Sequence, residues 1–223
     1  MQRVSFFIDG FNVYHKINEY QEKTGICYKW LDYKSFLNSF LQSDQLLQDI
    51  YFFTAVSKSR GQLSIDRHNK YITALQNTGV KVIIGKFITT PITCKVKNCN
   101  YSGSKEFMKD EEKKSDVNLA INMVLDSSKD VYDKCFLFSS DSDFVPALKM
   151  VKEMGKNVGL LVPPQDKVVK VTAIDELKGI CFGKGNSVIE TKFDELGKYL
   201  LPSVIIDPKT NIAVKMPIGY QSK

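Results

Sequence analysis

Four aspartates in this sequence are placed where their side chains could meet in one acidic site. Asp9 directly follows an apolar run near the N-terminus, and Asp141 and Asp143 follow another apolar run much later in the chain. Asp116 stands close to the start of an amphipathic segment, so it can point toward the same place from the N-terminus of a helix. Carboxylates gathered at one point repel one another, and their ionised form is stable only when a cation compensates the charge. The four acids therefore predict a metal site.

The chemistry of such a site follows from its oxygen ligands. Carboxylates suit Mg²⁺ or Mn²⁺, and Mg²⁺ is often held by one or two carboxylates together with a substrate phosphate. A metal held in this way polarises the scissile phosphate and helps to deprotonate an attacking water. His15 and His68 have no serine or cysteine motif beside them that would form a nucleophilic triad, and we expect both at the surface. The predicted reaction is hydrolysis of a phosphodiester bond by an activated water.

Three polar residues next to the acids are expected to support the site. Asn12 lies shortly after Asp9, where it can either cap a helix or reach back toward the acids. Ser139 and Ser140 precede Asp141 and add hydroxyl groups at the same strand exit.

Each acid also has a purely structural interpretation. Aspartate is a preferred N-cap residue, so Asp116 taken alone is more often a helix cap than a metal ligand. One of Asp141 and Asp143 is expected to cap the helix that begins near Phe144. The occurrence of acids after two different strands, which capping does not require, favours the functional interpretation.

Basic residues indicate a polyanionic substrate. Eight lysines lie between positions 81 and 114, and part of this stretch, Phe87 to Lys114, has little apolar periodicity and is expected to be a long loop. Its lysines and interspersed aromatic residues favour an arm that binds nucleic acid, and a solvated surface excursion is the alternative. Lys113, Arg60 and Arg67 are candidates for phosphate contact, although the two arginines also fit ordinary solvated charges.

The elements that must position these residues alternate along the chain. Short, nearly unbroken apolar runs are typical of buried parallel strands, and longer stretches between them have helical periodicity. The expected strands are Val4–Ile8, Ile50–Val56, Val80–Ile84, Cys135–Phe138 and Val158–Val162, and the expected helices are Tyr33–Leu47, Leu63–Asn77, Val117–Leu125, Phe144–Met154 and Asp166–Leu177. This order predicts an α/β fold with a doubly wound, mostly parallel sheet flanked by helices. In such a sheet ligands bind outside the carboxyl ends of the strands, where the acids are expected.

A less regular segment ends the chain. We expect one domain over residues 1–175 and a small C-terminal extension over residues 176–223. Within this extension, Val204–Ile206 and Ile212–Val214 flank a turn and predict a terminal β-hairpin. The role of the extension is left open.

Composition limits the class of protein. The net charge of +6 weakly favours a polyanionic partner, and no run of apolar residues is long enough to span a membrane. We expect a soluble, cytoplasmic protein that has no membrane partner. Five cysteines, one of them in an apolar run, do not indicate a disulfide framework. Cys94 and Cys99 could form half of a structural Zn²⁺ site, but the other half is missing nearby, so two free thiols are the preferred interpretation.

Three segments resemble the NYN domains, which form the LabA-like group of the PIN-like nuclease superfamily. Phe7–Asn12 is similar to the opening motif of that family, Glu112–Ala120 to its Glu-Lys-x-x-Asp-Val segment, and Ser139–Pro146 to its Ser-Gly-Asp-Ser-Asp-Phe segment, with Ser140 replacing the usual glycine. The resemblance extends over about residues 4 to 164. It implies a PIN-like, Rossmannoid fold, with Asp9, Asp116, Asp141 and Asp143 at the metal site, and metal-dependent ribonuclease activity.

The sequence therefore predicts a divalent-metal-dependent endoribonuclease. Two alternatives stay open: a non-catalytic RNA-binding or regulatory module, and the toxin nuclease of a toxin–antitoxin pair. Whether DNA is also a substrate, which RNA is cut and whether the chain forms a homo-oligomer are left open.

Overall fold

A six-stranded sheet forms the centre of the molecule. The computed structural model describes residues 1–57, 59–165, 172–207 and 210–222. In spatial order the strands are β3 (Lys81–Ile84), β2 (Gln45–Thr54), β1 (Gln2–Asp9), β6 (Lys134–Phe138), β7 (Asn157–Val162) and β8 (Ser187–Glu190). Each neighbouring pair in this sheet is parallel. The predicted doubly wound, mostly parallel α/β fold is thus confirmed.

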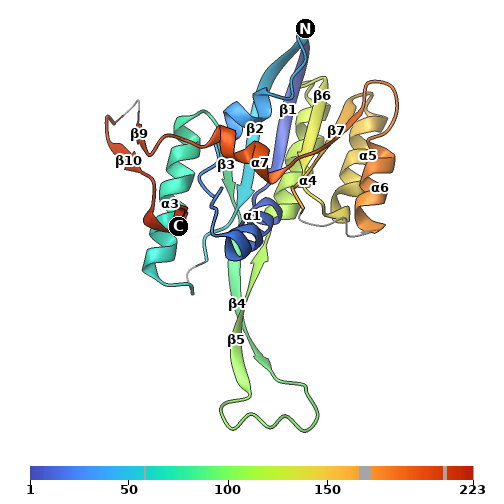
Figure 1. Ribbon diagram of the computed structural model, residues 1–223. Coiled ribbons are helices and arrows are strands. Elements are labelled where there is room, and N and C mark those ends of the chain that lie inside the picture. The colour runs from blue at the N-terminus through green and yellow to red at the C-terminus, as the bar shows by residue number, and fades with distance from the viewer. Residues whose placement is uncertain (58, 166–171, 208–209, 223) are drawn as a thin grey trace.

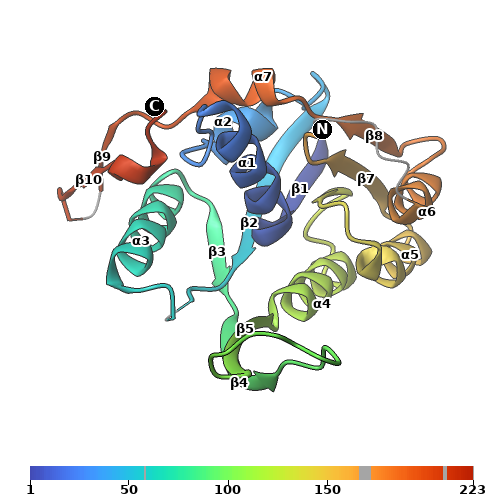
Figure 2. The ribbon, with the colours of Figure 1, turned by 60° about the horizontal axis from the view of Figure 1, so that its bottom comes forward.

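Helices cover both faces of the sheet (Figures 1 and 2). One face carries α1 (Gly10–Thr24), α2 (Tyr33–Asn38), α3 (Gln62–Asn77) and the short α7 (Phe193–Leu196), and the other carries α4 (Ser115–Ser128), α5 (Val145–Glu153) and α6 (Thr172–Ile180). Two apolar cores result, one on each side of the sheet.

The central strand β1 contributes to both cores. Val4, Phe6 and Ile8 pack among the helices α1 to α3, whereas Phe7 packs on the side of α4. Side chains alternate between the faces of a strand, so Asp9 leaves β1 on the same side as Phe7. The alternation therefore directs this carboxyl group toward the start of α4.

The predicted helix Tyr33–Leu47 is wrong in its second half. Helix α2 ends at Asn38, and β2 begins at Gln45. Phe36 and Leu37 of the helix and Leu47 of the strand all pack against the same apolar core. Their spacing imitates one long amphipathic helix because two consecutive elements cover the same face.

The predicted loop Phe87–Lys114 is also wrong, because most of it forms a projecting β-hairpin (Figure 1). Strand β4 (Lys86–Thr93) pairs in antiparallel fashion with β5 (Glu106–Lys113). Both strands are largely exposed, so neither has the apolar alternation by which a half-buried strand is recognised. Cross-strand polar contacts replace it, such as that from Thr89 Oγ1 to Asp110 Oδ1 at 2.7 Å.

Residues after 176 pack against both cores of the sheet. Strand β8 extends the sheet, and β9 (Val204–Ile206) pairs in antiparallel fashion with β10 (Ala213–Lys215). The indole nitrogen of Trp30 donates to the carbonyl oxygen of Pro202 at 2.9 Å, and Tyr220 packs beside the Trp30 ring. Of the predicted helix Asp166–Leu177, the first six residues lie outside the described residues, and α6 continues beyond it to Ile180.

In the described part of the chain, no helix combines the length and apolar character needed to cross a membrane.

Candidate active site

Asp9 occupies a buried position at the junction of β1 and α1, where it is 7% exposed. Its Oδ1 accepts a hydrogen bond from the backbone N–H of Asn12 at 3.0 Å, which makes it the N-cap of α1. Its Oδ2 accepts from the hydroxyl group of Ser139 at 2.9 Å. Both carboxylate oxygens are therefore held in fixed directions, one by a donor in the first turn of α1 and the other by a donor just after β6.

Asn12 links the same two strand ends. Its Oδ1 accepts from the backbone N–H of Ser140 at 3.1 Å and from the Ser140 hydroxyl at 2.9 Å. Asp9 caps helix α1, so Asn12 is not the cap. Asn12 instead reaches across the edge of the sheet to the loop that carries Asp141, which was the second role considered for it. Ser139 completes the link, since its Oγ also accepts from the backbone N–H of Asp141 at 3.1 Å. Asn12, Ser139 and Ser140 thus hold Asp9 and the residues between β6 and Asp141 in contact with one another.

Asp141 and Asp143 follow β6, Asp141 just before a short 3₁₀ turn, η1 (Ser142–Phe144), and Asp143 within it. Asp141 Oδ1 accepts from the backbone N–H of Asp143 at 3.0 Å, so Asp141 caps this turn. Neither acid caps helix α5, whose cap position is Phe144 without a side-chain hydrogen bond, so the expected cap lies one short turn earlier than predicted. Asp143 is exposed to solvent.

Asp116 lies inside the first turn of α4, so its interpretation as the N-cap of that helix is wrong. The cap position belongs to Lys114, which has a left-handed φ of 80° and makes no side-chain cap hydrogen bond. An acid in the first turn is favourable because it faces the positive end of the helix dipole. Partial burial raises the pKa of Asp116, and the negative charges of Asp141 and Asp143 raise it further.

Electrostatic coupling places these acids in one cluster. Burial raises the pKa of Asp9 to about 6, against the lowering effect of its hydrogen bonds with Asn12 and Ser139, and the charges of Asp116 and Asp141 add to the rise. The carboxylates at the end of β1, at the start of α4 and after β6 are thus close enough for the charge of one to affect the pKa of another. We call Asp9, Asp116, Asp141 and Asp143 the acidic cluster.

Glu112 is a fifth acid at this place that was not among the predicted site residues. It is the penultimate residue of β5, and burial raises its pKa to about 7 against the lowering effect of the nearby Ser115 hydroxyl group, with the charges of Asp116 and Asp9 adding to the rise. Its Oε1 is buried and has no hydrogen-bond partner among the described residues. Its position four residues before Asp116, in a segment already singled out, was the signal in the sequence.

The donor set fits a hard divalent cation, but the side chains are not arranged for one. In the described part of the chain, no three Asp, Glu, His or Cys side chains are close enough together to hold a metal ion. The unpartnered Glu112 oxygen and the exposed Asp143 carboxylate are donors that a cation would satisfy. Metal binding at this place therefore requires the carboxylates to rotate toward one another.

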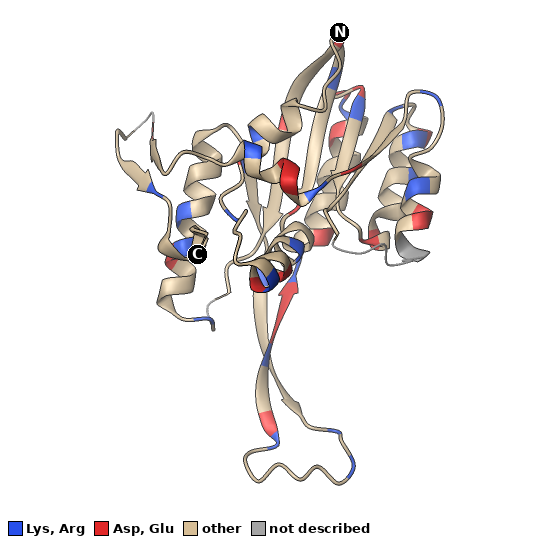
Figure 3. Ribbon diagram, viewed as in Figure 1, with Lys and Arg blue, Asp and Glu red and all other residues tan. Residues whose placement is uncertain are grey.

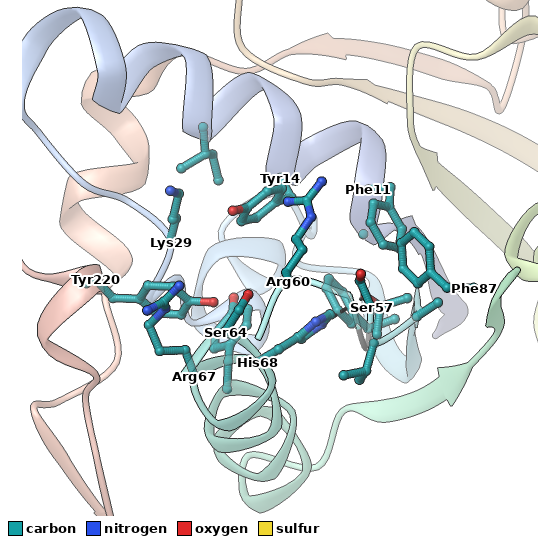
Figure 4. Close-up of a pocket in the computed structure, with 18 of the residues that line it drawn as sticks. Phe11, Tyr14, Lys29, Ser57, Arg60, Ser64, Arg67, His68, Phe87 and Tyr220 are labelled. Atoms are coloured by element: carbon teal, nitrogen blue, oxygen red, sulfur yellow. Dashed lines mark hydrogen bonds between the residues drawn. The ribbon is translucent and has the colours of Figure 1, made fainter. Parts of the chain in front are cut away.

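The candidate phosphate-binding residues lie in different places. Lys113 Nζ pairs with Glu111 Oε2 at 3.0 Å on the hairpin. Arg60 and Arg67 instead line a cavity of about 320 Å³ between α1 and α3 (Figure 4). The structure brings the arginines together and leaves Lys113 apart from them.

The prediction that both histidines lie at the surface is wrong for His68. His15 is exposed, but His68 lines the same cavity and its Nε2 is hydrogen-bonded to Thr54 Oγ1 at 3.0 Å. Burial lowers the pKa of His68 to about 4, so its ring is neutral at physiological pH. The cavity could not be foreseen from a local pattern, since its walls come from α1, the loop after β2, α3, Phe87 and the C-terminal Gly219 and Tyr220.

Comparison with known proteins agrees with this architecture. The chain matches the NYN domain over residues 3–176. It belongs to the NYN domain family, which places it in the PIN-like nuclease superfamily.

Two individual proteins are also similar to it. The 6-hydroxy-3-succinoylpyridine 3-monooxygenase HspA of Pseudomonas putida is 30% identical over 190 residues, which cover 72% of this chain and 59% of that relative. The chain thus spans less than two thirds of its length. A crystal structure of a protein of unknown function from Vibrio parahaemolyticus has a TM-score of 0.51 at 14% identity, covering 90% of this chain and 96% of that one. This second likeness shows the fold alone.

Proposed function

We propose that this protein is a divalent-metal-dependent endoribonuclease whose active site is the acidic cluster together with Glu112. The observation that carries the proposal is the link between Asp9 at the end of β1 and the Asp141 turn after β6, which the Ser139 hydroxyl group makes by donating to Asp9 and accepting from the Asp141 backbone. The charges of Asp116 and Asp141 raise the pKa of Asp9, which supports a common site. A helix cap has no need of a second acid nearby, and accumulated negative charge at a strand edge costs free energy unless a cation binds there.

The residues divide the work of hydrolysis. Asp9, oriented by Asn12 and Ser139, and the carboxylates of Asp116, Asp141 and Asp143 would hold the cation, which would supply Lewis-acid polarisation of the phosphate and activation of water. The water oxygen forms a bond to phosphorus as the bond to the leaving ribose oxygen breaks. A carboxylate of the cluster accepts the proton that the water loses, and the leaving oxygen takes up a proton from solvent.

The projecting hairpin supports a polynucleotide as the substrate. Figure 3 shows acidic residues on β5 close to the body and basic residues around the far end of the hairpin, where Glu106 at the start of β5 is also acidic. Lys95, Lys97 and Lys105 belong to this outer part, and the connection between the two strands also carries the exposed ring of Tyr101. Exposed cations beside an exposed aromatic ring suit the phosphates and bases of an RNA strand that approaches the acidic cluster from outside.

Cleavage of labelled RNA tests the proposal. Wild type, Asp141→Asn and Asp9→Asn are compared on a single-stranded RNA, a structured RNA and a matched DNA, with Mg²⁺, Mn²⁺ or EDTA. Asp44→Asn is the matched control, because Asp44 is an exposed acid whose backbone carbonyl meets Gln2 at the opposite edge of the sheet. We expect metal-dependent cleavage that both cluster variants lose and the control keeps.

Two other results would favour the alternative functions. RNA that binds without being cut by wild type in any metal would make the protein a binding module. Growth arrest on expression, relieved by Asp141→Asn, would indicate the toxin of a toxin–antitoxin pair. The monooxygenase activity in the name of the Pseudomonas relative is not carried over, because the chain spans 59% of that protein and the acidic cluster suits hydrolysis.

A further inference from the structure

The cavity between α1 and α3 adjoins the acidic cluster without sharing its residues. Its volume of about 320 Å³ is comparable to that of sites for small organic ligands, roughly 300–1,000 Å³. Gly10 and Phe11, which directly follow Asp9, form the wall nearest the cluster. No Asp or Glu of the described residues lines it. The cavity is therefore a separate compartment at the same edge of the sheet.

Aromatic rings form much of the cavity wall (Figure 4). The rings of Phe11 and Phe87 meet edge to face with centroids 5.5 Å apart, and those of Tyr71 and Tyr220 do so at 5.9 Å. Tyr14 lies between these two pairs along the wall that α1 provides. Rings fixed by such packing offer flat surfaces on which a planar heteroaromatic group can stack.

Three cations face the same space. Arg60 and Arg67 border the cavity, and Lys29 stands at one end, where its Nζ donates to Asn18 Oδ1 at 2.5 Å. None of the three forms an ion pair within 4.0 Å with a carboxylate of the described residues. The stem of Arg67 is held against the C-terminal segment, since its Cδ lies 3.1 Å from where a side chain on Gly219 would begin. A held guanidinium group without a carboxylate partner favours an anionic ligand.

The start of α3 adds to this positive field. Gly61 occupies the cap position with φ of 78°, and no side chain of the described residues caps the helix. The N-terminus of a 16-residue helix carries partial positive charge, and its backbone N–H groups suit a phosphate. Arg60 directly precedes this terminus and Ser64 lies in the first turn of the helix, and both line the cavity, so an anion there would meet the guanidinium group and the Ser64 hydroxyl group beside the helix terminus.

The cavity wall also contains neutral groups that could form hydrogen bonds with the edge of a heteroaromatic ring. Thr54 and His68 are hydrogen-bonded to each other at the cavity wall. The low pKa of His68, about 4 because of burial, keeps its ring uncharged, so it adds no further positive charge. The cavity thus combines stacking surfaces, an anion site and neutral hydrogen-bonding groups.

We propose that this cavity is a nucleotide subsite, which takes one unstacked nucleotide with its base between the aromatic rings and its phosphate on Arg60 and Arg67. The inference deepens the proposed function, and it rests on that function for the claim that the nucleotide belongs to an RNA strand. Because Gly10 and Phe11 separate the cavity from Asp9, the strand that places a base here lays a neighbouring phosphate at the acidic cluster. The enzyme is then specific for unpaired RNA.

Direct binding tests the subsite without any cleavage. Titration calorimetry in EDTA measures the affinity of the intact protein for the four nucleoside monophosphates, the matching nucleosides, the aromatic carboxylate nicotinate and a short unstructured RNA. The variants are Arg60→Gln and Arg67→Gln, with Lys70→Gln as the control, because Lys70 is an exposed cation on the same helix that does not line the cavity. Melting temperatures confirm that each variant is folded, and Arg60 lies in an exposed loop position where its loss spares the core.

We expect nucleoside monophosphates to bind and each arginine variant to weaken that binding about tenfold, as the loss of a charge-assisted hydrogen bond should. Nucleosides should bind more weakly than the monophosphates, and the RNA should bind more tightly. Unchanged affinity in both arginine variants, or binding of nicotinate in place of the nucleotides, overturns the subsite. A mononucleotide that the RNA does not displace overturns its placement in a substrate strand.

The subsite and the nuclease can fail separately. Asp141→Asn should bind nucleotides as the wild type does while it loses cleavage. Nucleotide binding without metal-dependent cleavage in the wild type would leave the subsite in place and overturn the proposed nuclease. Metal-dependent cleavage by the wild type without measurable nucleotide binding would support the nuclease and overturn the subsite.

Discussion

The hydroxyl group of Ser139 donates a hydrogen bond to Asp9 Oδ2 at 2.9 Å and accepts one from the backbone N–H of Asp141 at 3.1 Å. One fully buried side chain thereby sets the distance between acids that lie far apart in the chain. The packing of β1 against β6 brings the two strand ends together, and this hydroxyl group converts that proximity into a fixed orientation.

Ser139→Ala should lower both stability and cleavage. The change leaves the Asp141 N–H without its acceptor and removes a donor that stabilises ionised Asp9, at an expected cost of about 1–3 kcal/mol in the free energy of unfolding. Urea denaturation measures this cost, and kcat on RNA reports the lost orientation. Ser128→Ala is the control, because that exposed hydroxyl only donates to a carbonyl of its own helix. Equal stability of both variants would show that the bridge contributes nothing.

Burial of His68 should make stability depend on pH. Its folded-state pKa of about 4 lies below the ordinary value of 6.5, so the unfolded chain binds the proton more readily between these values. Stability is therefore complete above pH 6.5 and falls as pH drops toward 4, by up to about 3 kcal/mol at 1.36 kcal/mol per pKa unit.

His68→Gln should remove this dependence and keep a hydrogen bond with Thr54. Urea unfolding at pH 7.5 and pH 4.5 compares wild type with His68→Gln and with His15→Gln, in which an exposed histidine is replaced. The slope between the two pH values should become shallower only in the His68 variant. A slope that stays the same in that variant would assign it to the carboxylates.

Most of the sheet and the positions of acids beyond its strand ends could be predicted because their signals are local. An apolar run that ends in an acid contains both the buried strand and the polar residue at its exit, as Phe136–Leu137–Phe138 and Asp141 illustrate. The hairpin and the cavity had no such signal. Backbone pairing holds β4 to β5 without an apolar face, and the cavity joins Arg67 to Tyr220 only after the C-terminal segment packs on the core. Glu112 lies between these cases, since its motif was visible but its burial was not.

Gly10 is required at the junction between Asp9 and α1. A Cβ atom there would lie 2.5 Å from the carbonyl oxygen of Phe53 and 2.7 Å from the Phe52 ring, both in the buried strand β2. Gly10→Ala should therefore destabilise the protein by about 1–3 kcal/mol through overpacking and should displace Asp9. Gly179→Ala is the matched control, because a Cβ there meets nothing within 4 Å in helix α6, and it should raise stability by about 0.4–1 kcal/mol. Thermal unfolding of both variants checks the opposite signs, and a harmless Gly10→Ala would contradict the close packing.

The outer lysines of the hairpin should determine how strongly RNA binding depends on salt. Lys95, Lys97 and Lys105 are exposed at the end of the hairpin, far from the acidic cluster (Figures 1 and 3). Replacing all three by glutamine should lower the slope of log affinity against log salt by about 2, since each phosphate contact to a single strand contributes roughly 0.7.

Filter binding in EDTA at several salt concentrations measures that slope apart from cleavage. The matched control replaces three exposed lysines elsewhere on the surface, Lys34, Lys149 and Lys198, and keeps the same net charge as the hairpin variant. If the slope falls equally in both triple variants, RNA responds to the overall charge and the hairpin is not an RNA-binding arm. If only the hairpin variant loses slope while its kcat on saturating RNA is unchanged, the hairpin captures the strand and the acidic cluster cuts it.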